Sequence, residues 1–288
     1  MTLAGPHPAG AKAGAPVKRG APTSPAFVLH QWDWSETSLI LDLFTRDRGR
    51  IAVVAKGAKR PYSQLRPVLM PFQRLLVLTG KPRAEEGADI LNLRTAEYAG
   101  AGASLPPARL FAGFYLNELL MKLLARADPH PRLFDAYADT LLALAADDDE
   151  SPLRAFEMLL LRETGVLPEL SRVTATQERV LPGSAYALLP EAGLARRTAG
   201  DLAANLALDG ACWLALQTAL DQPLLAPLRA ASRAALGPLK GQLRALLHYH
   251  LGSPHLRTRQ LMLDVRRLLD DSPSPASGAH PPAEPHPP

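Results

Sequence analysis

Short apolar runs, separated by polar and turn-forming positions, dominate the chain between residues 26 and 99. Five short segments in this region are rich in β-branched and aromatic side chains, and Gly, Pro and Asp positions that favour turns separate them. The predicted strands are AFVLHQW (26–32), TSLILDLFT (37–45), RIAVVAK (50–56), RLLVLTG (74–80) and DILNLRTAEY (89–98). Five strands without a long helix predict a small closed barrel and favour the five-stranded OB-fold.

The period of the pattern changes after the sequence SLPP (residues 104–107), where apolar residues begin to recur every three or four positions. The predicted helical segments span residues 108–127, 132–145, 147–165, 210–220, 226–252 and 257–269. A turn-rich insert with short strand-like pieces, residues 168–195, interrupts them. The sequence therefore predicts an α+β protein, with an OB-fold domain over residues 26–102 followed by a mostly α-helical domain over residues 103–271.

The two ends of the chain differ from both predicted domains. Residues 1–25 and 272–288 are rich in Ala, Gly and Pro and have too few apolar side chains to offset the entropy of ordering. We predict that both ends are disordered, and we assign them no function. The start lacks the apolar core of a signal peptide, no apolar run approaches the roughly 18 residues of a membrane span, and Cys212 has no partner for a disulfide. We therefore expect a cytoplasmic protein without a membrane segment.

Positive charge is concentrated in one part of the predicted barrel. The 288-residue chain carries a formal net charge of +4, but ten basic residues and one acidic residue, Asp47, lie between residues 46 and 83. The ten are Arg46, Arg48, Arg50, Lys56, Lys59, Arg60, Arg66, Arg74, Lys81 and Arg83. Such a block is typical of a surface that binds a polyanion, although a solvated face has the same composition.

The stretch VVAKGAKRPYSQLRP, residues 53–67, invites comparison with a phosphate-binding loop of an enzyme. A P-loop requires GxxxxGK followed by Ser or Thr, whereas this stretch has the single glycine Gly57 and a Lys-Arg pair. The histidines of HYHLGSPH (248–255) are not spaced to share a helix face, and the acidic run at residues 147–150 is typical of a solvated helix start. Because no catalytic constellation is recognisable, the sequence predicts a non-enzyme without a cofactor or metal.

The same stretch meets the requirements for binding nucleic acid, which are cations along the backbone and flat side chains that stack on bases. The predicted DNA contacts are Arg48, Arg50, Lys56, Lys59, Arg60, Arg66, Arg74 and Lys81, and the predicted stacking side chains are Trp34 and Tyr62. Trp32 and Trp34 share one face of an alternating strand, and the alternative is that both are buried in the barrel or against the next domain. Charge and stacking do not distinguish DNA from RNA, so an RNA-binding OB-fold protein is an open alternative.

Several segments of the chain carry a family resemblance. The longest is WSETSLILDLFTRDRGRIAVVAKGAKRPYSQLRPVLMPFQRL (34–75), which is similar to the N-terminal OB-domain of the RecO family of bacterial recombination mediators. FYLNELLMKLL (114–124) resembles its first long helix, and LRAFEMLLLRETGVLPEL (153–170) resembles its LRxFE helix. GSPHLRTRQLM (252–262) is similar to its C-terminal ending, with Thr258 where Ser is usual. The resemblance covers roughly residues 26–270.

The resemblance implies a specific function. RecO-like proteins bind single- and double-stranded DNA, anneal complementary strands, and act with RecR on DNA coated by single-strand-binding protein (SSB), so that RecA is loaded in the RecF pathway. They hydrolyse no nucleotide and work in the cytoplasm at the nucleoid. An alternative within this resemblance is an adaptor that mainly bridges SSB and RecR, with DNA contact secondary.

The turn-rich insert departs from the family pattern. Many RecO-like proteins carry a four-cysteine zinc site there, whereas residues 168–195 of this chain contain no cysteine. We therefore predict an insert without zinc ligands. Packing would hold it instead, through the apolar side chains of Leu181, Tyr186, Leu188 and Leu189.

RecO-like proteins also recognise the acidic, hydrophobic-tipped C-terminus of SSB. Such a peptide requires an apolar pocket and a cation for its terminal carboxylate. Arg154, which Leu153 and Phe156 flank, is the candidate for that cation. The alternative is a surface arginine that balances the acidic residues 147–150.

Overall fold

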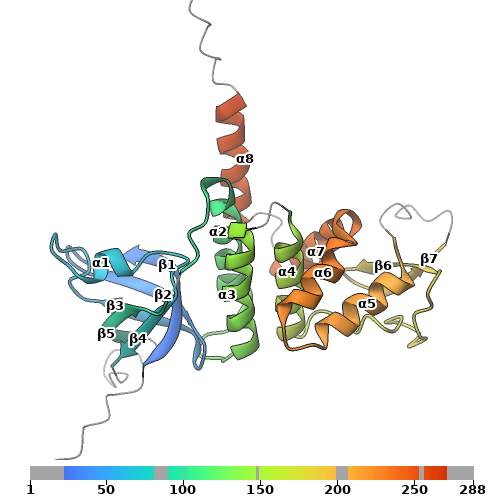
Figure 1. Cartoon of the computed structure of the whole chain (residues 1–288), viewed down its shortest axis with the longest axis horizontal. Helices are drawn as coiled ribbons and strands as arrows, with labels where there is room; N and C mark the ends of the chain where they lie inside the picture. The colour runs from blue at the N-terminus through green and yellow to red at the C-terminus, as the bar shows by residue number, and fades with distance from the viewer. Residues whose placement is uncertain are drawn as a thin grey trace, which may run out of the picture.

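The computed structural model of the chain describes residues 23–80, 90–100, 102–146, 149–198, 207–252 and 256–270. A β-barrel, a central layer of helices, and a second helical group with a small sheet follow one another along the long axis of the molecule (Figure 1). The predicted OB-fold barrel followed by a helical region is thus confirmed. Both predicted disordered ends lie almost entirely outside the described residues, as do Lys81 and Arg83.

The barrel consists of β1 (Ser24–Asp33), β2 (Leu39–Thr45), β3 (Gly49–Ala55), β4 (Leu75–Thr79) and β5 (Ile90–Tyr98). It closes in the order β1-β2-β3-β5-β4, with β3 and β5 parallel and the other pairs antiparallel. Alternate strand residues fill its interior, among them Val28, Leu41, Leu43, Val53, Leu75 and Val77. A single turn of helix, α1 (Leu65–Val68), lies between β3 and β4 and was not expected from the sequence, because four residues are too few to show a helical period.

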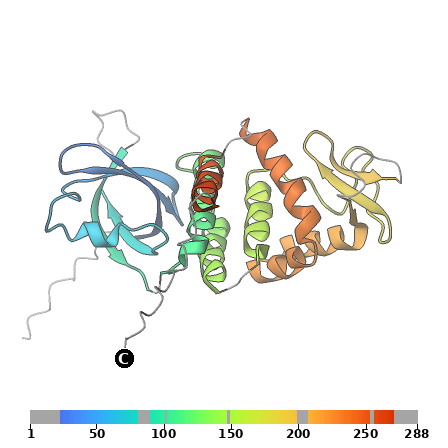
Figure 2. The ribbon, with the colours of Figure 1, turned by 90° about the horizontal axis from the view of Figure 1, so that it is seen from above.

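The helical region contains α2 (Pro107–Leu123), α3 (Pro131–Ala146), α4 (Ser151–Glu163), α5 (Gly210–Leu220), α6 (Leu225–Arg233), α7 (Leu236–Leu251) and α8 (Arg257–Asp270). The predicted segment 226–252 divides into α6 and α7. Pro238 lies in the first turn of α7, where its missing N–H costs no hydrogen bond. In Figure 2, α2 and α3 lie between the barrel and the group formed by α4 to α7.

The barrel and the central helices share one hydrophobic core. Phe27 of β1 and Phe44 of β2 pack against Phe134 and Tyr137 of α3 and are buried with them. The rings of Phe27 and Tyr137 meet edge to face with centroids 4.9 Å apart. This end of the outer β1–β2 face is therefore covered by the helical region and closed to ligands.

Polar contacts cross the same interface. The Asn117 side chain donates a hydrogen bond to the Leu29 carbonyl at 2.9 Å and accepts one from the Tyr137 hydroxyl. Gly49, the first residue of β3, has a φ of 64°, and a Cβ atom there would lie 1.8 Å from the backbone oxygen of Asp128. Only glycine permits this approach, so this position fixes how closely the barrel and the helices pack.

The insert after α4 folds into a three-stranded sheet of β6 (Ala185–Leu189), β7 (Gly193–Arg197) and β8 (Leu208–Asp209), in the order β7-β6-β8. Tyr186 and Leu188 are buried and Leu189 is half-buried, as the sequence predicted. Leu181 is 54% exposed, so its predicted place in the packing is wrong, and its backbone N–H instead donates to the Tyr186 hydroxyl at 3.0 Å. The indole of the buried Trp213 donates to the Tyr186 carbonyl at 3.2 Å and ties the sheet to α5.

The last described helix, α8, projects beyond the end of α2 (Figure 1), and Figure 2 shows it lying over α2. Its first turn is held by Glu118 of α2, whose two carboxylate oxygens accept the backbone N–H groups of Arg257 and Thr258 at 2.9 Å each. A carboxylate at a helix N-terminus satisfies donors that the helix itself leaves unpaired. Glu118 thus anchors α8 to the body of the molecule.

Candidate nucleic-acid interface

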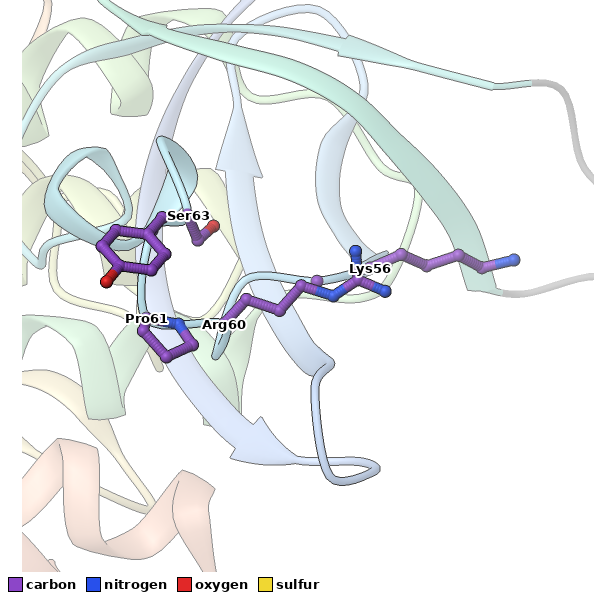
Figure 3. A pocket seen from close by; sticks show the side chains of 6 residues that line it. Lys56, Arg60, Pro61 and Ser63 are labelled. Carbon is purple, nitrogen blue, oxygen red and sulfur yellow. The ribbon is translucent and has the colours of Figure 1, made fainter.

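The loop after β3, residues 56–64, leaves the barrel through a tight turn. Gly57 has a φ of 72°, and its carbonyl accepts the Arg60 N–H at 3.1 Å. A shallow, open pocket of about 460 Å³ lies on this loop, which we call the cationic loop, and its lining is Lys56, Gly57, Arg60, Pro61, Tyr62 and Ser63. Figure 3 shows the side chains of Lys56 and Arg60 extending in the same direction, away from Pro61 and Ser63.

The outward side chains of this region carry no acidic partner within the part of the chain that the structure describes. Lys56, Arg60 and Arg66 are exposed, and Tyr62 is 94% exposed. The Arg60 side chain lies over Gly57, with its Cδ 3.6 Å from the position that a Cβ would take. The turn thus directs two cations and a flat ring towards solvent, which is the arrangement that a phosphate backbone with unstacked bases requires.

Lys59 belongs to the same loop but has bound partners. Its ammonium group lies 3.2 Å from the Asp33 carboxylate and donates to the Ser35 carbonyl at 3.2 Å. Its backbone N–H donates to the Thr37 carbonyl at 3.0 Å. Lys59 therefore links the cationic loop to the β1–β2 loop, residues 34–38, which adjoins it at the same end of the barrel.

Trp32 and Trp34 lie beside this link and are exposed, at 42% and 62% of their surface. The alternative that both tryptophans are buried is therefore wrong. Trp32 pairs in register with Ile40 of β2, and the centroids of the Trp32 and His30 rings lie 4.4 Å apart. The uncovered end of the outer β1–β2 face thus carries aromatic rings next to the cationic loop.

Two predicted DNA contacts face the helical region instead of this surface. The side chain of Arg50 is 14% exposed, and its guanidinium donates to the carbonyls of Met121 and Leu124, the latter at 3.1 Å, and lies 3.4 Å from Asp42. Arg74 is half-buried, with its guanidinium 5.9 Å from the ring of Phe134. The sequence could not show this, because Met121, Leu124 and Phe134 lie 60 to 74 residues away from these arginines.

Arg48 and Asp42 are two further charged residues of the barrel that are partly or fully buried. Arg48 is half-buried, with two guanidinium nitrogens shielded from solvent. The pKa of the Asp42 carboxyl is raised above its ordinary value, because the effect of burial exceeds the opposing effect of the Arg50 and Arg126 guanidinium groups. Among the described cations of the charge block, Lys56, Arg60 and Arg66 therefore face solvent, whereas Arg50 and Arg74 face the helical region.

The predicted peptide-binding arginine, Arg154, is buried and 5% exposed. Its guanidinium pairs with Glu157 at 2.8 Å, and Glu157 in turn accepts the Tyr115 hydroxyl at 2.7 Å. Burial raises the pKa of the Glu157 carboxyl. Leu153 and Phe156 are buried as well, so neither an open pocket nor a surface arginine exists at this position.

An apolar depression of about 420 Å³ lies instead where the barrel meets α2. Four of its lining side chains, Met70, Tyr98, Leu110 and Phe114, are between 37% and 52% exposed. They come from three segments of the chain, and no pattern in the sequence predicts that these segments meet. Exposed apolar side chains that gather in one hollow are typical of a protein-binding surface.

The described residues contain no group of three or more His, Cys, Asp or Glu side chains that could hold a metal ion. His248 and His250 lie in the last turn of α7, and His255 falls outside the described residues. None of the described helices is long and apolar enough to cross a membrane.

Comparison with known proteins identifies relatives over most of the chain. Residues 22–97 match the family described as Recombination protein O N terminal, and residues 106–260 match Recombination protein O C terminal. The chain is 50% identical to the DNA repair protein RecO of Acidovorax ebreus (strain TPSY) over 257 residues, which is 85% of this chain and 97% of the relative. It is 49% identical to the DNA repair protein RecO of Polaromonas naphthalenivorans (strain CJ2) over 248 residues, 85% of this chain and 96% of the relative. The chain therefore belongs to the RecO family of DNA repair proteins.

Proposed function

We propose that this protein is a non-catalytic mediator of DNA repair and homologous recombination that binds single- and double-stranded DNA through the cationic loop and anneals complementary strands. The observation that carries the proposal is the group of Lys56, Arg60 and Arg66, which face solvent beside the fully exposed ring of Tyr62. Family membership supports DNA as the ligand, since the relatives bear the name DNA repair protein.

Annealing requires that two polyanions approach each other while their repulsion is neutralised. Each Lys or Arg that replaces a condensed counterion contributes affinity that depends on salt and is independent of base sequence. A rigid barrel that holds several such cations therefore raises the local concentration of strands without chemistry. The proposed action involves no nucleotide hydrolysis.

The wider proposal is that the protein acts with RecR on DNA coated by SSB, so that RecA is loaded, in the cytoplasm at the nucleoid. It is supported by membership of the RecO family. A second function, an adaptor that bridges SSB and RecR, is favoured by the apolar depression around Tyr98 and Phe114. Because Leu153, Arg154 and Phe156 are buried, a contact of the SSB tail with them would require the helices around α4 to open.

The test of DNA binding is a salt titration of Lys56→Glu/Arg60→Glu with labelled single strands, read by fluorescence anisotropy. Loss of two phosphate contacts lowers the slope of log K against log salt by about 1.4 for single strands. Arg179→Glu/Arg196→Glu is the matched control, since both arginines are exposed on the insert and the charge change is equal. An unchanged slope in Lys56→Glu/Arg60→Glu, with both variants folded, would refute the assignment. RNA strands of the same base sequence serve as competitors, and they test whether the protein prefers DNA to RNA.

A further inference from the structure

We propose that Trp32 and Trp34 form a base-stacking subsite selective for single-stranded DNA, and that Lys59 positions this subsite and does not bind phosphate. The inference rests on the proposed function and adds a second kind of contact to it. The cationic loop meets phosphates, which single strands and duplexes both present. The tryptophan pair meets base faces, which only unpaired strands present.

The first argument is the uneven covering of one sheet face. At one end of the outer β1–β2 face, Phe27 and Phe44 are buried against α3. At the other end, the described residues place no helix over Trp32. This side chain is 42% exposed, and its cross-strand partner Ile40 is half-buried. Large rings left in water on an otherwise packed face are typical of a ligand-binding surface.

The second argument is the spacing of the two rings along the chain. Trp32 and Trp34 are separated by one residue, so their Cα atoms lie at most about 7 Å apart. Successive bases rise by about 3.4 Å along a DNA strand, so Cα atoms this far apart leave room for one base between two rings that extend side by side. A base in a duplex has both faces covered by its neighbours and cannot enter. The subsite therefore selects a base that has left the stack.

The third argument is the position of Lys59. Its ammonium group contacts Asp33, which lies between the two tryptophans, and Ser35, which follows them. Its backbone bond to Thr37 fixes the other end of the same loop. Two oxygen partners at 3.2 Å occupy this cation, in contrast to Lys56 and Arg60. Lys59 is thus built to hold the β1–β2 loop, and with it Trp34, against the cationic loop.

The deciding experiment compares a dT oligonucleotide with an abasic oligonucleotide of equal length and phosphate number. A stacked base contributes about 5- to 150-fold in affinity, so wild-type protein should bind the dT strand more tightly by a factor in that range. Trp32→Ala/Trp34→Ala should lower this ratio to the part that the exposed ring of Tyr62 contributes, and should leave the abasic affinity unchanged. Lys56→Glu/Arg60→Glu should weaken both strands and keep the ratio.

Tryptophan fluorescence provides a separate signal, because Trp213 is fully buried in the helical region and should not respond. Quenching by the dT strand, and not by the abasic strand, supports the subsite. A ratio near one in the wild type overturns the inference while the proposed function stands. Absence of binding to either strand at low salt overturns both.

Lys59→Met and Lys59→Arg test the positioning role. If Lys59 positions the tryptophans, Lys59→Met lowers the dT-to-abasic ratio and leaves the salt slope for the abasic strand unchanged, and Lys59→Arg restores the ratio. If Lys59 binds phosphate, Lys59→Met instead lowers the slope by about 0.7 for both strands and keeps the ratio. That second result would overturn this part of the inference.

Discussion

The carboxylate of Glu118 makes the docking of α8 sensitive to a single substitution. Glu118→Ala removes both acceptors of the Arg257 and Thr258 N–H groups. Loss of such a cap costs about 0.5–2 kcal/mol, and the helix-dipole contribution adds about 0.3–1 kcal/mol. The docking free energy of α8 should therefore fall by about 1–3 kcal/mol.

Amide hydrogen exchange of α8 is the assay, because the loss is local to the contact between α8 and α2. Protection of the α8 amides should fall by about 5- to 150-fold while that of the barrel strands is unchanged. Glu178→Ala, at an exposed glutamate of the insert, is the control. A change of less than about twofold in α8 would show that packing against α2, and not the carboxylate, holds the helix.

The pH dependence of the same contact has a definite sign. Burial acts to raise the pKa of Glu118, but the backbone N–H groups of Thr258 and Arg257 outweigh it, and the pKa is lowered. A group with a lowered pKa in the folded state contributes stability above its unfolded value, about 4.3, and loses it as the pH falls through the folded value. Wild-type protection of α8 should therefore decline in acid, whereas that of Glu118→Gln should start low and change little.

Three further substitutions test the fold and the surfaces. Asn117→Ala leaves the Leu29 carbonyl and the Tyr137 hydroxyl buried without their partner. The free energy of unfolding, measured in urea by tryptophan fluorescence, should therefore fall by about 2–4 kcal/mol. A fall of less than about 1 kcal/mol would contradict the role of these hydrogen bonds at the interface. Gly57→Ala places a Cβ on a residue with left-handed backbone angles, so the free energy of unfolding should fall by about 1–2 kcal/mol. The variant should also bind DNA more weakly. Unchanged stability would mean that the turn relaxes to another conformation. Phe114→Ala should weaken binding of an acidic, apolar-tipped peptide in an anisotropy titration and spare DNA binding. The control Leu142→Ala, at an apolar side chain of α3 that is 51% exposed against 41% for Phe114, should alter neither.

The barrel strands could be predicted from the sequence because each is a short run of β-forming side chains bounded by turn residues. Burial alternates along β4, whereas β2 buries five consecutive residues because α3 covers part of its outer face. Long helices such as α3 and α7 were equally visible, since their buried residues recur every three or four positions. α1 could not be predicted because it is one turn long and buries none of its residues. The exposed position of Leu181 was not visible either, because an apolar side chain in a turn-rich segment carries no period that assigns it to a face.

The residue types of the candidate site could be predicted from the sequence, but which of its side chains face solvent could not. The sequence located the basic segment correctly, and Lys56 and Arg60 do face solvent. It gave no sign that Arg50 turns towards Met121, or that Arg154 is enclosed with Glu157, because such partners depend on how distant segments pack. The charge of a side chain can be read from a sequence, whereas the atoms that surround the charge cannot.

The shared aromatic core has a consequence for how the barrel can be used. An excised barrel ending near residue 102 would lose α3 and expose Phe27 and Phe44 to water. Such a fragment would self-associate through this patch unless the two rings were replaced by polar side chains. Although the OB-fold is often a portable module, here it is half of a larger folding unit, and grafting it onto another protein would require a substitute for α3.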